Sequence, residues 1–135
     1  MIQQRTNMDW MLKDLADGVP HTRHIIVLSA DGLRMAQHGT DTDTADRLAA
    51  ACAGLQSLAA AVGHEFPEGD GRMRLVVIEV SGGFFYLMAA GARAYLAVLA
   101  DDGVDAGLVG QRMRDLVARI GEHLSTPPRN GESAA

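Results

Sequence analysis

The sequence predicts an α+β domain with elements in the order α-β-β-α-β-β-β-α, a five-stranded antiparallel sheet and helices on both sheet faces. Three observations support this prediction. Apolar residues repeat at helical spacing in three stretches of the chain. Five short apolar runs, several rich in β-branched residues, lie between those stretches. Spacers of two or three residues separate the last three runs, which favours hairpins and antiparallel pairing.

The composition is that of one globular domain. The chain has 135 residues, of which 47% are hydrophobic and 21% charged. We expect the domain at residues 7–124, a flexible N-terminus at 1–6 and a disordered tail at 125–135. A net charge of -5 argues against nucleic acid as a partner. Cys52 is the single cysteine, and no transmembrane or signal segment is recognisable, so we expect a cytoplasmic protein.

The expected elements have identifiable boundaries. Helices are predicted over residues 7–17, 44–63 and 104–124, and strands over His24–Ser29, Leu33–His38, Arg74–Val80, Phe84–Ala90 and Arg93–Ala100. Thr6 or Asn7 can cap the first helix, and the Asp and Thr residues at 41–44 can cap the second. Asp105 places negative charge at the start of the third helix, where the helix dipole favours it.

The Asp31-Gly32 pair lies between the first two strands and predicts a tight hairpin. A type I′ turn needs positive φ at both central positions, and Asp and Gly tolerate that conformation best. Ser29 and Asp31 also form a serine–acid pair, but no base stands beside them and the GxSxG pattern is absent. We therefore interpret Asp31 as a turn residue.

The middle helix has one apolar stripe with steps of three and four residues. Its members are Leu48, Cys52, Leu55, Ala59, Val62 and Phe66, and we expect this stripe to lie on the sheet. Cys52 is then a small buried hydrophobe rather than a reactive thiol.

The other faces of this helix carry mainly small residues, including Gly54, which is unfavourable inside a helix. Close approach of another backbone would explain them, although alanine is also simply a good helix former. The apolar strand Arg74–Val80 would be an aggregation hazard if it lies at a sheet edge. Two copies pairing edge to edge, with their small-faced helices crossing, would cover both features about one two-fold axis.

Residues that could catalyse a reaction or hold a metal are scattered. None of the five histidines forms an HxH, HExxH or i, i+4 pair. Gly82-Gly83 and the glycines of GDG at 69–71 lack the lysine and Ser/Thr of a phosphate-binding loop. We find no nucleophile–base pair, and we expect no catalytic residue, cofactor or metal.

Three stretches together resemble the roadblock/dynein-light-chain domain family in its bacterial form. They are MDWMLKDLADGVPHTRHIIVLSADGLRMA, DRLAAACAGLQSLAAAVGHEF and RLVVIEVSGGFFYLMAAGARAYLAVLADD, within about residues 8–124. The "VLSADGL" hairpin and the "GLQSLA" segment are the most specific parts. The resemblance implies a roadblock/profilin-like fold and a homodimer whose sheet continues across both subunits through the third strand.

The resemblance also implies a function. Members of this family are non-enzymatic regulators, and some bacterial relatives stimulate GTP hydrolysis by a Ras-like GTPase without inserting a catalytic arginine. The chain resembles proteins of actinobacterial conservon gene clusters, which also encode a small Ras-like GTPase and a sensor histidine kinase-like protein. Both are expected partners in a signalling complex, and any membrane location would be peripheral, through partners. Activation, exchange and tethering of the GTPase all stay open.

The resemblance assigns roles to individual residues of this chain. The implied subunit contact uses Ala50, Ala53, Gly54, Ser57, Ala61, Arg74, Val76 and Ile78. The exposed residues expected to contact the GTPase are Arg47, Gln56 and His64.

A small-molecule sensor of the PAS or GAF kind is the alternative, because it shares a five-stranded antiparallel sheet with flanking helices. Such a sensor needs a cavity with a few convergent polar groups. The strand interiors of this chain are almost wholly apolar.

Overall fold

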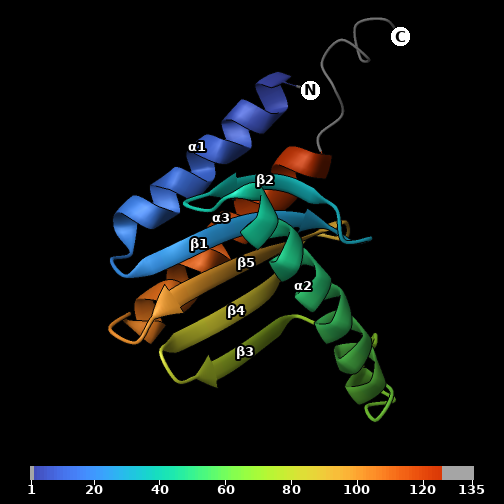
Figure 1. Ribbon diagram of the computed structural model, residues 1–135. Coiled ribbons are helices and arrows are strands. Elements are labelled where there is room, and N and C mark those ends of the chain that lie inside the picture. The colour runs from blue at the N-terminus through green and yellow to red at the C-terminus, as the bar shows by residue number, and fades with distance from the viewer. Residues whose placement is uncertain (1, 126–135) are drawn as a thin grey trace, which may run out of the picture.

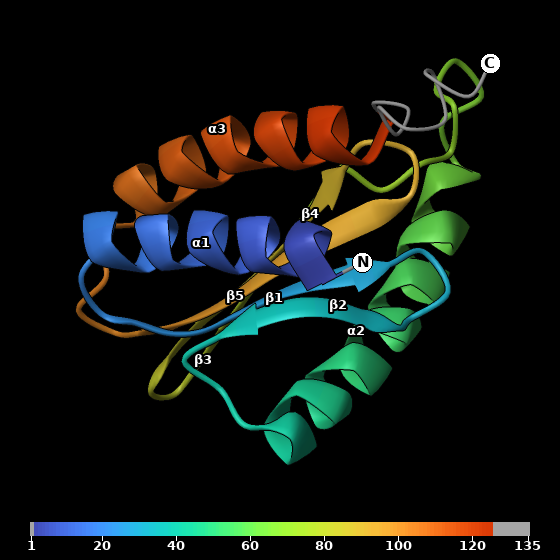
Figure 2. The ribbon, with the colours of Figure 1, turned by 90° about the horizontal axis from the view of Figure 1, so that it is seen from above.

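The computed structural model describes residues 2–125, and its elements follow the predicted order. They are α1 (Ile2–Gly18), β1 (Thr22–Ser29), β2 (Arg34–His38), α2 (Thr42–Gly63), β3 (Leu75–Val80), β4 (Gly83–Ala90), β5 (Ala94–Asp101) and α3 (Ala106–Ser125). The strands form one antiparallel sheet in the order β2-β1-β5-β4-β3. Helix α2 crosses one face (Figure 1), and α1 and α3 lie side by side over the other (Figure 2). The predicted α+β architecture is confirmed.

The sheet is buried on both faces, and β1 shows why its sequence is continuously apolar. Ile25 and Val27 pack into the cluster beneath α1 and α3, which we call the α3-side core. Ile26 and Leu28 pack into the cluster beneath α2, the α2-side core. All four side chains are buried, as expected for a strand covered on both faces.

Helix α1 is longer than predicted. The sequence suggested a cap at Thr6 or Asn7, but the backbone is helical from Ile2 onward. Residues 2–6 contain no glycine or proline, and glutamine and arginine are good helix formers, so nothing interrupts the helix there. The expected tail lies outside the described residues from position 126.

The β1–β2 connection is a hairpin, but the predicted type I′ turn is wrong. Gly32 has a φ of 88°, whereas Asp31 does not have positive φ. The amide of Gly32 donates to the Ser29 carbonyl at 3.0 Å, and the amide of Ser29 donates to the Leu33 carbonyl at 2.8 Å. This is a three-residue loop closed by a left-handed glycine. The Ser29 hydroxyl donates to the Asp31 carboxylate, so Asp31 is a turn residue, as expected.

Candidate functional site

Helix α2 begins at a well-formed cap. Asp41 has an extended backbone, and its carboxylate accepts a hydrogen bond from the backbone N–H of Thr44 at 2.7 Å. This bond favours the charged carboxylate and therefore holds the pKa of Asp41 below its usual value. The Asp and Thr residues at 41–44 thus start the helix, two residues earlier than the predicted position 44.

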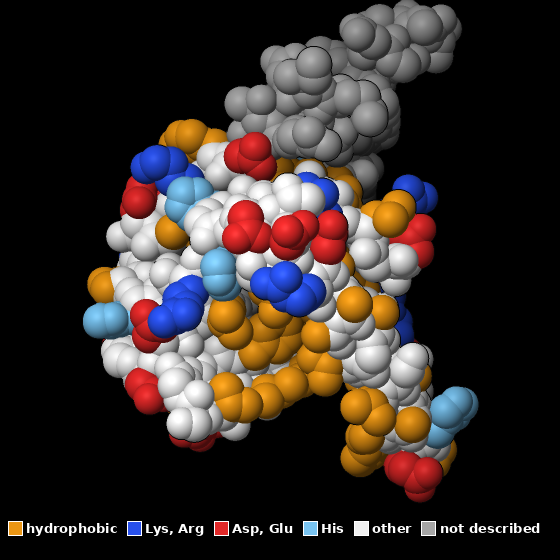
Figure 3. All heavy atoms as spheres, viewed as in Figure 1, with side chains coloured by type: hydrophobic (Ala, Val, Ile, Leu, Met, Phe, Trp, Pro, Cys, Tyr) orange, Lys and Arg blue, Asp and Glu red, His pale blue; other side chains and the backbone are white. Residues whose placement is uncertain are grey.

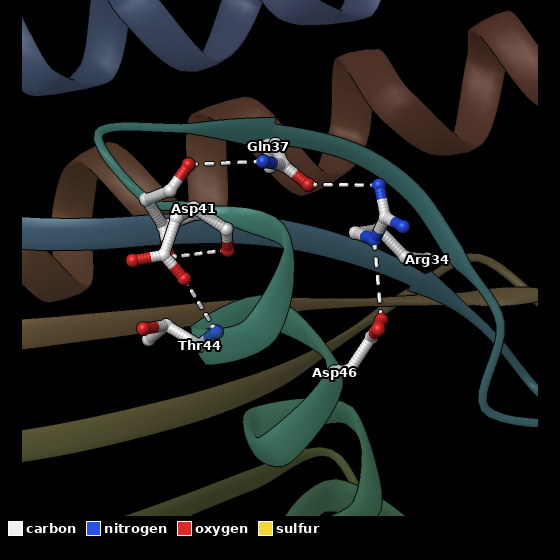
Figure 4. A network of polar contacts seen from close by, with 6 residues as sticks. Arg34, Gln37, Asp41, Thr44 and Asp46 are labelled. Carbon is white, nitrogen blue, oxygen red and sulfur yellow. Dashed lines mark hydrogen bonds and ion pairs between the residues drawn. The ribbon is translucent and has the colours of Figure 1, made fainter.

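A polar network ties this end of α2 to the edge strand β2 (Figure 4). The Arg34 guanidinium lies 3.5 Å from the Asp46 carboxylate and donates to the Gln37 amide oxygen at 3.0 Å. The Gln37 amide in turn donates to the Thr40 carbonyl at 2.9 Å. These contacts attach α2 to the sheet at its beginning, and they place polar side chains on one of the two sheet edges.

Only the first half of α2 packs against the sheet. Ala45, Ala49 and Cys52 are buried, but Val62 and Phe66 are 60% and 61% exposed. The prediction that the whole apolar stripe lies on the sheet is therefore wrong beyond the middle of the helix. The helix crosses the sheet obliquely and its C-terminal half projects beyond it (Figure 1). Periodicity identifies a common face, but the crossing angle determines how much of that face is covered.

An apolar groove opens between α2 and the sheet, with a volume of about 400 Å³. Its lining residues all lack polar side chains: Leu48, Ala51, Gly54, Leu55, Leu58, Ile78, Phe85 and Leu99. A hydrophobic hollow lies at this place on the surface (Figure 3). Leu58 on its rim is 66% exposed. An open apolar surface of this kind is typical of a site of protein association.

Strand β3 forms the second sheet edge, beside this groove, and pairs only with β4 among the described residues. Unlike β2, it carries exposed aliphatic side chains, and Val77 and Val80 are 49% and 58% exposed. An exposed apolar edge is a template for pairing with another strand. Strand β3 therefore lies at a sheet edge, as the hypothesis of edge-to-edge pairing between two copies requires.

Of the eight predicted interface residues, Gly54 and Ile78 line the groove, and the set falls into two groups by exposure. Ala50, Ala53, Gly54, Ser57, Ala61 and Arg74 are exposed, whereas Val76 and Ile78 are half-buried against the α2-side core. A Cβ on Gly54 would meet nothing within 4 Å, so no contact within one chain explains that glycine. Sequence reasoning missed four lining residues: Ala51, Leu58, Phe85 and Leu99. The only available signal was Leu58, a large apolar residue outside the predicted buried stripe.

The three residues expected to contact a GTPase are not brought together. Arg47 is exposed near the start of α2 and donates to the Thr44 hydroxyl at 3.1 Å. His64 is exposed at the C-terminal cap, about 25 Å farther along the helix at 1.5 Å per residue. Gln56 is half-buried, and its amide nitrogen is buried with no hydrogen-bond partner among the described residues. The expectation that Gln56 is exposed is therefore wrong.

Cys52, the single cysteine, is buried in the α2-side core near this surface. Burial raises the pKa of the Cys52 thiol to about 11, so the thiol stays protonated at neutral pH. Within residues 2–125, no group of three or more His, Cys, Asp or Glu residues could hold a metal ion. The described helices include none with the length and apolar character needed to cross a membrane.

Comparisons with known proteins give the family. The Roadblock/LC7 domain family matches residues 8–100. A Roadblock/LC7 domain from Streptomyces avermitilis is 40% identical, with a TM-score of 0.80 over 87% of this chain and 98% of that chain. The gliding protein MglB from Thermus thermophilus shares the fold at 17% identity, with a TM-score of 0.80 over 89% of this chain and 90% of that chain.

A structure described as MglB with a tetrameric arrangement also shares the fold, at 16% identity and a TM-score of 0.80, over 89% of each chain. A search of curated proteins finds no match. The family match covers α2, β3, β4 and nearly all of β5, and so includes every residue that lines the groove. The chain belongs to the Roadblock/LC7 domain family.

Proposed function

We propose that this protein is a homodimeric regulatory scaffold that binds a small Ras-like GTPase in a cytoplasmic signalling complex and catalyses no reaction itself. The observation that carries the proposal is the continuous apolar surface formed by the α2–β3 groove and the unpaired β3 edge. Membership of the Roadblock/LC7 family supports it, because the resemblance to bacterial members implies action on such GTPases. A sensor histidine kinase-like protein is the third proposed component.

In the proposed dimer, β3 pairs with β3 of the second copy and the two α2 helices cross over the joined sheet. The groove of each copy then receives the projecting half of the other α2, which carries the exposed Leu58 and Val62 and is followed by the exposed Phe66. The proposed subunit contact also includes Ala50, Ala53, Gly54, Ser57, Ala61, Arg74, Val76 and Ile78. The tetrameric arrangement of one MglB structure supports association between copies of this fold.

The proposed GTPase contact uses the outer surface of the paired α2 helices. Arg47 and His64 are exposed there, near opposite ends of the helix. Gln56 remains a proposed contact through its half-buried side chain. The GTPase would therefore contact a surface that exists only in the dimer, so loss of the dimer should abolish its binding.

Two exposed leucines provide a matched test of the dimer. Leu58 on the groove is 66% exposed and Leu33 in the β1–β2 loop is 64% exposed. Light scattering should show a dimer for the native chain and for Leu33→Glu, and a folded monomer for Leu58→Glu. A dimeric Leu58→Glu protein would contradict the proposed interface.

Affinity capture tests the partner. The tagged native protein and the Leu58→Glu variant are incubated with native lysate and either GDP or a non-hydrolysable GTP analogue. The native dimer should retain a Ras-like GTPase, and the monomeric variant should not. Retention with only one of the two nucleotides would show which nucleotide-bound state of the GTPase the protein binds. Absence of any GTPase, from cells shown to contain one, would contradict the proposal.

The groove also bears on the alternative of a small-molecule sensor. Its volume falls within the range of ligand sites, but its lining lacks the convergent polar groups that orient a ligand. A small molecule co-purifying at one per chain would favour the sensor over the scaffold.

A further inference from the structure

Strand β3 is also exposed on the sheet face opposite the groove. Its register pairs Leu75 with Met88 and Val77 with Tyr86, and both β4 residues belong to the α3-side core. Directly paired residues share a face, so Leu75 and Val77 point to the α3 side. Helix α3 lies over β4 and β5, and Leu75 and Val77 remain 47% and 49% exposed. We call Leu75, Val77 and Glu79 the β3 strip.

The flank of α3 beside the β3 strip includes two glycines, Gly110 and Gly121. Arg112, Asp115 and Arg119 line a small cavity shared with α1. Helical periodicity places Gly110, Val117 and Gly121 on the opposite flank, where Gly121 stands against Gly91 of the β4–β5 turn. The Arg114 guanidinium lies near Gly110 on this flank, 3.4 Å from the place of a Cβ. Small side chains allow another backbone to approach closely.

A polar group at this place lacks a partner. Tyr86 is only 5% exposed, and its buried hydroxyl has no hydrogen-bond partner among the described residues. Burial and the nearby negative charge of Glu79 raise the pKa of Tyr86. A buried hydroxyl without a partner is unfavourable, so a small shift of the Tyr86 side chain toward a donor or acceptor on an incoming chain would stabilise this face.

The proposed dimer, on which this inference rests, turns the β3 strip into a groove. When β3 pairs with β3 of the second copy, two β3 strips form one floor and the two α3 helices form its walls. Four strand spacings of about 4.8 Å then separate the helix axes, a distance of about 19 Å. Packed helices lie about 8–10 Å apart, so this gap accommodates one further helix.

The other occupants fit less well. A strand cannot add to the sheet here, because the dimer already uses the free edge of β3. The remaining residues of the chain, 126–135, follow α3 directly but contain no large aliphatic or aromatic side chain to match Leu75 and Val77. The six residues of β3 span about 20 Å, which corresponds to about 13 residues of α-helix.

We propose that the α3-side face of the dimer binds one amphipathic α-helix of a partner protein. Its aliphatic side lies on the two copies of Leu75 and Val77, with a basic residue toward Glu79 and an acidic residue toward Arg114. A polar residue of the helix pairs with the Tyr86 hydroxyl. This site lies on the opposite sheet face from α2, so the dimer binds the GTPase and the helix at the same time and connects them.

A designed peptide tests this site before the partner is identified. The probe is a fluorescent, net-neutral peptide of leucine, lysine and glutamate with leucines at i, i+3, i+4 and i+7. A peptide of equal composition with alternating leucines is the control. Titration calorimetry should give one helical peptide per two chains and no binding of the alternating peptide. Equal binding of both peptides, or one peptide per chain, would overturn the proposal.

Two valine substitutions on the same strand locate the bound helix. Val77→Thr should weaken peptide binding about tenfold, because each copy loses a buried methyl group. Val80→Thr is the matched control, because register pairs Val80 with Gly83 on the opposite face. A larger loss of peptide affinity for Val80→Thr than for Val77→Thr, or no loss for Val77→Thr, would contradict the site.

Light scattering on the same samples separates the two proposals. A monomeric native chain would refute the proposed dimer and, with it, the groove. A dimer that fails to bind the helical peptide at half stoichiometry would refute the helix site and leave the dimer in place.

Discussion

Gly83 of β4 stands against Ala100 of β5 so closely that a Cβ on Gly83 would lie 2.0 Å from the Ala100 carbonyl oxygen. The next residue, Phe84, is the register partner of Ala100, so the ladder between the two strands fixes that oxygen. At position 83 of β4 there is therefore space for the hydrogen atom of a glycine but not for a Cβ.

Replacement of Gly83 by alanine should destabilise the domain by about 3 kcal/mol, because the clash is with backbone and forces the strands apart. Urea denaturation followed by circular dichroism measures the change. An unchanged midpoint would contradict the close approach of β4 and β5.

Replacement of Gly54 by alanine should have the opposite effect. A Cβ there meets nothing within 4 Å in its own chain, so in the monomeric Leu58→Glu background the change should raise the free energy of unfolding by up to about 1 kcal/mol through helix propensity. Gly54→Leu tests the small face in the same place. It should keep the fold but dissociate the dimer in light scattering, and a dimer that tolerates leucine would exclude Gly54 from the subunit contact.

Stability should fall at alkaline pH because of Cys52. Burial raises the pKa of its thiol from 9.0 to about 11, so the folded state retains a proton that the unfolded state loses. This contribution is complete below pH 9 and falls by about 2–3 kcal/mol as the pH approaches 11. Tyr86 acts in the same direction above its usual pKa of 10.0. Urea titrations of native and Cys52→Ala protein isolate the cysteine, and parallel pH profiles would contradict the assignment.

The stability that the Asp41 cap contributes should decrease at acidic pH. Its pKa is lowered because the Thr44 N–H donates to the carboxylate, so its stabilising effect is complete above pH 3.8 and is lost as the pH falls through the lowered value. Asp41→Ala should lower Tm at pH 7, and this difference should shrink in acid. Asp41→Asn, which retains a capping oxygen, should keep most of the stability at pH 7. Equal Tm values for all three proteins at pH 7 would argue against the cap.

The sequence predicted local features well because they depend on neighbouring residues. The three helices, five strands and the Asp31-Gly32 turn position follow from periodicity, caps and turn residues. Cys52 lies in the core, as the stripe predicted, although its buried neighbours on the helix are Ala45 and Ala49 rather than the half-buried Leu48 and Leu55. The predictions of the turn type and of the first residue of α1 were wrong, since both depend on backbone geometry that several sequences can satisfy.

Residue spacing alone specifies the order of elements, the two-sided burial of β1 and the small face of α2, because each follows from where residue types recur along the chain. The position of β3 at a sheet edge depends instead on pairing between distant segments, so it emerges only when the strands assemble. The same is true of the exposure of Val62 and Phe66. The oblique crossing of α2 leaves half of an apolar stripe without a partner, and no pattern within the helix specifies that angle.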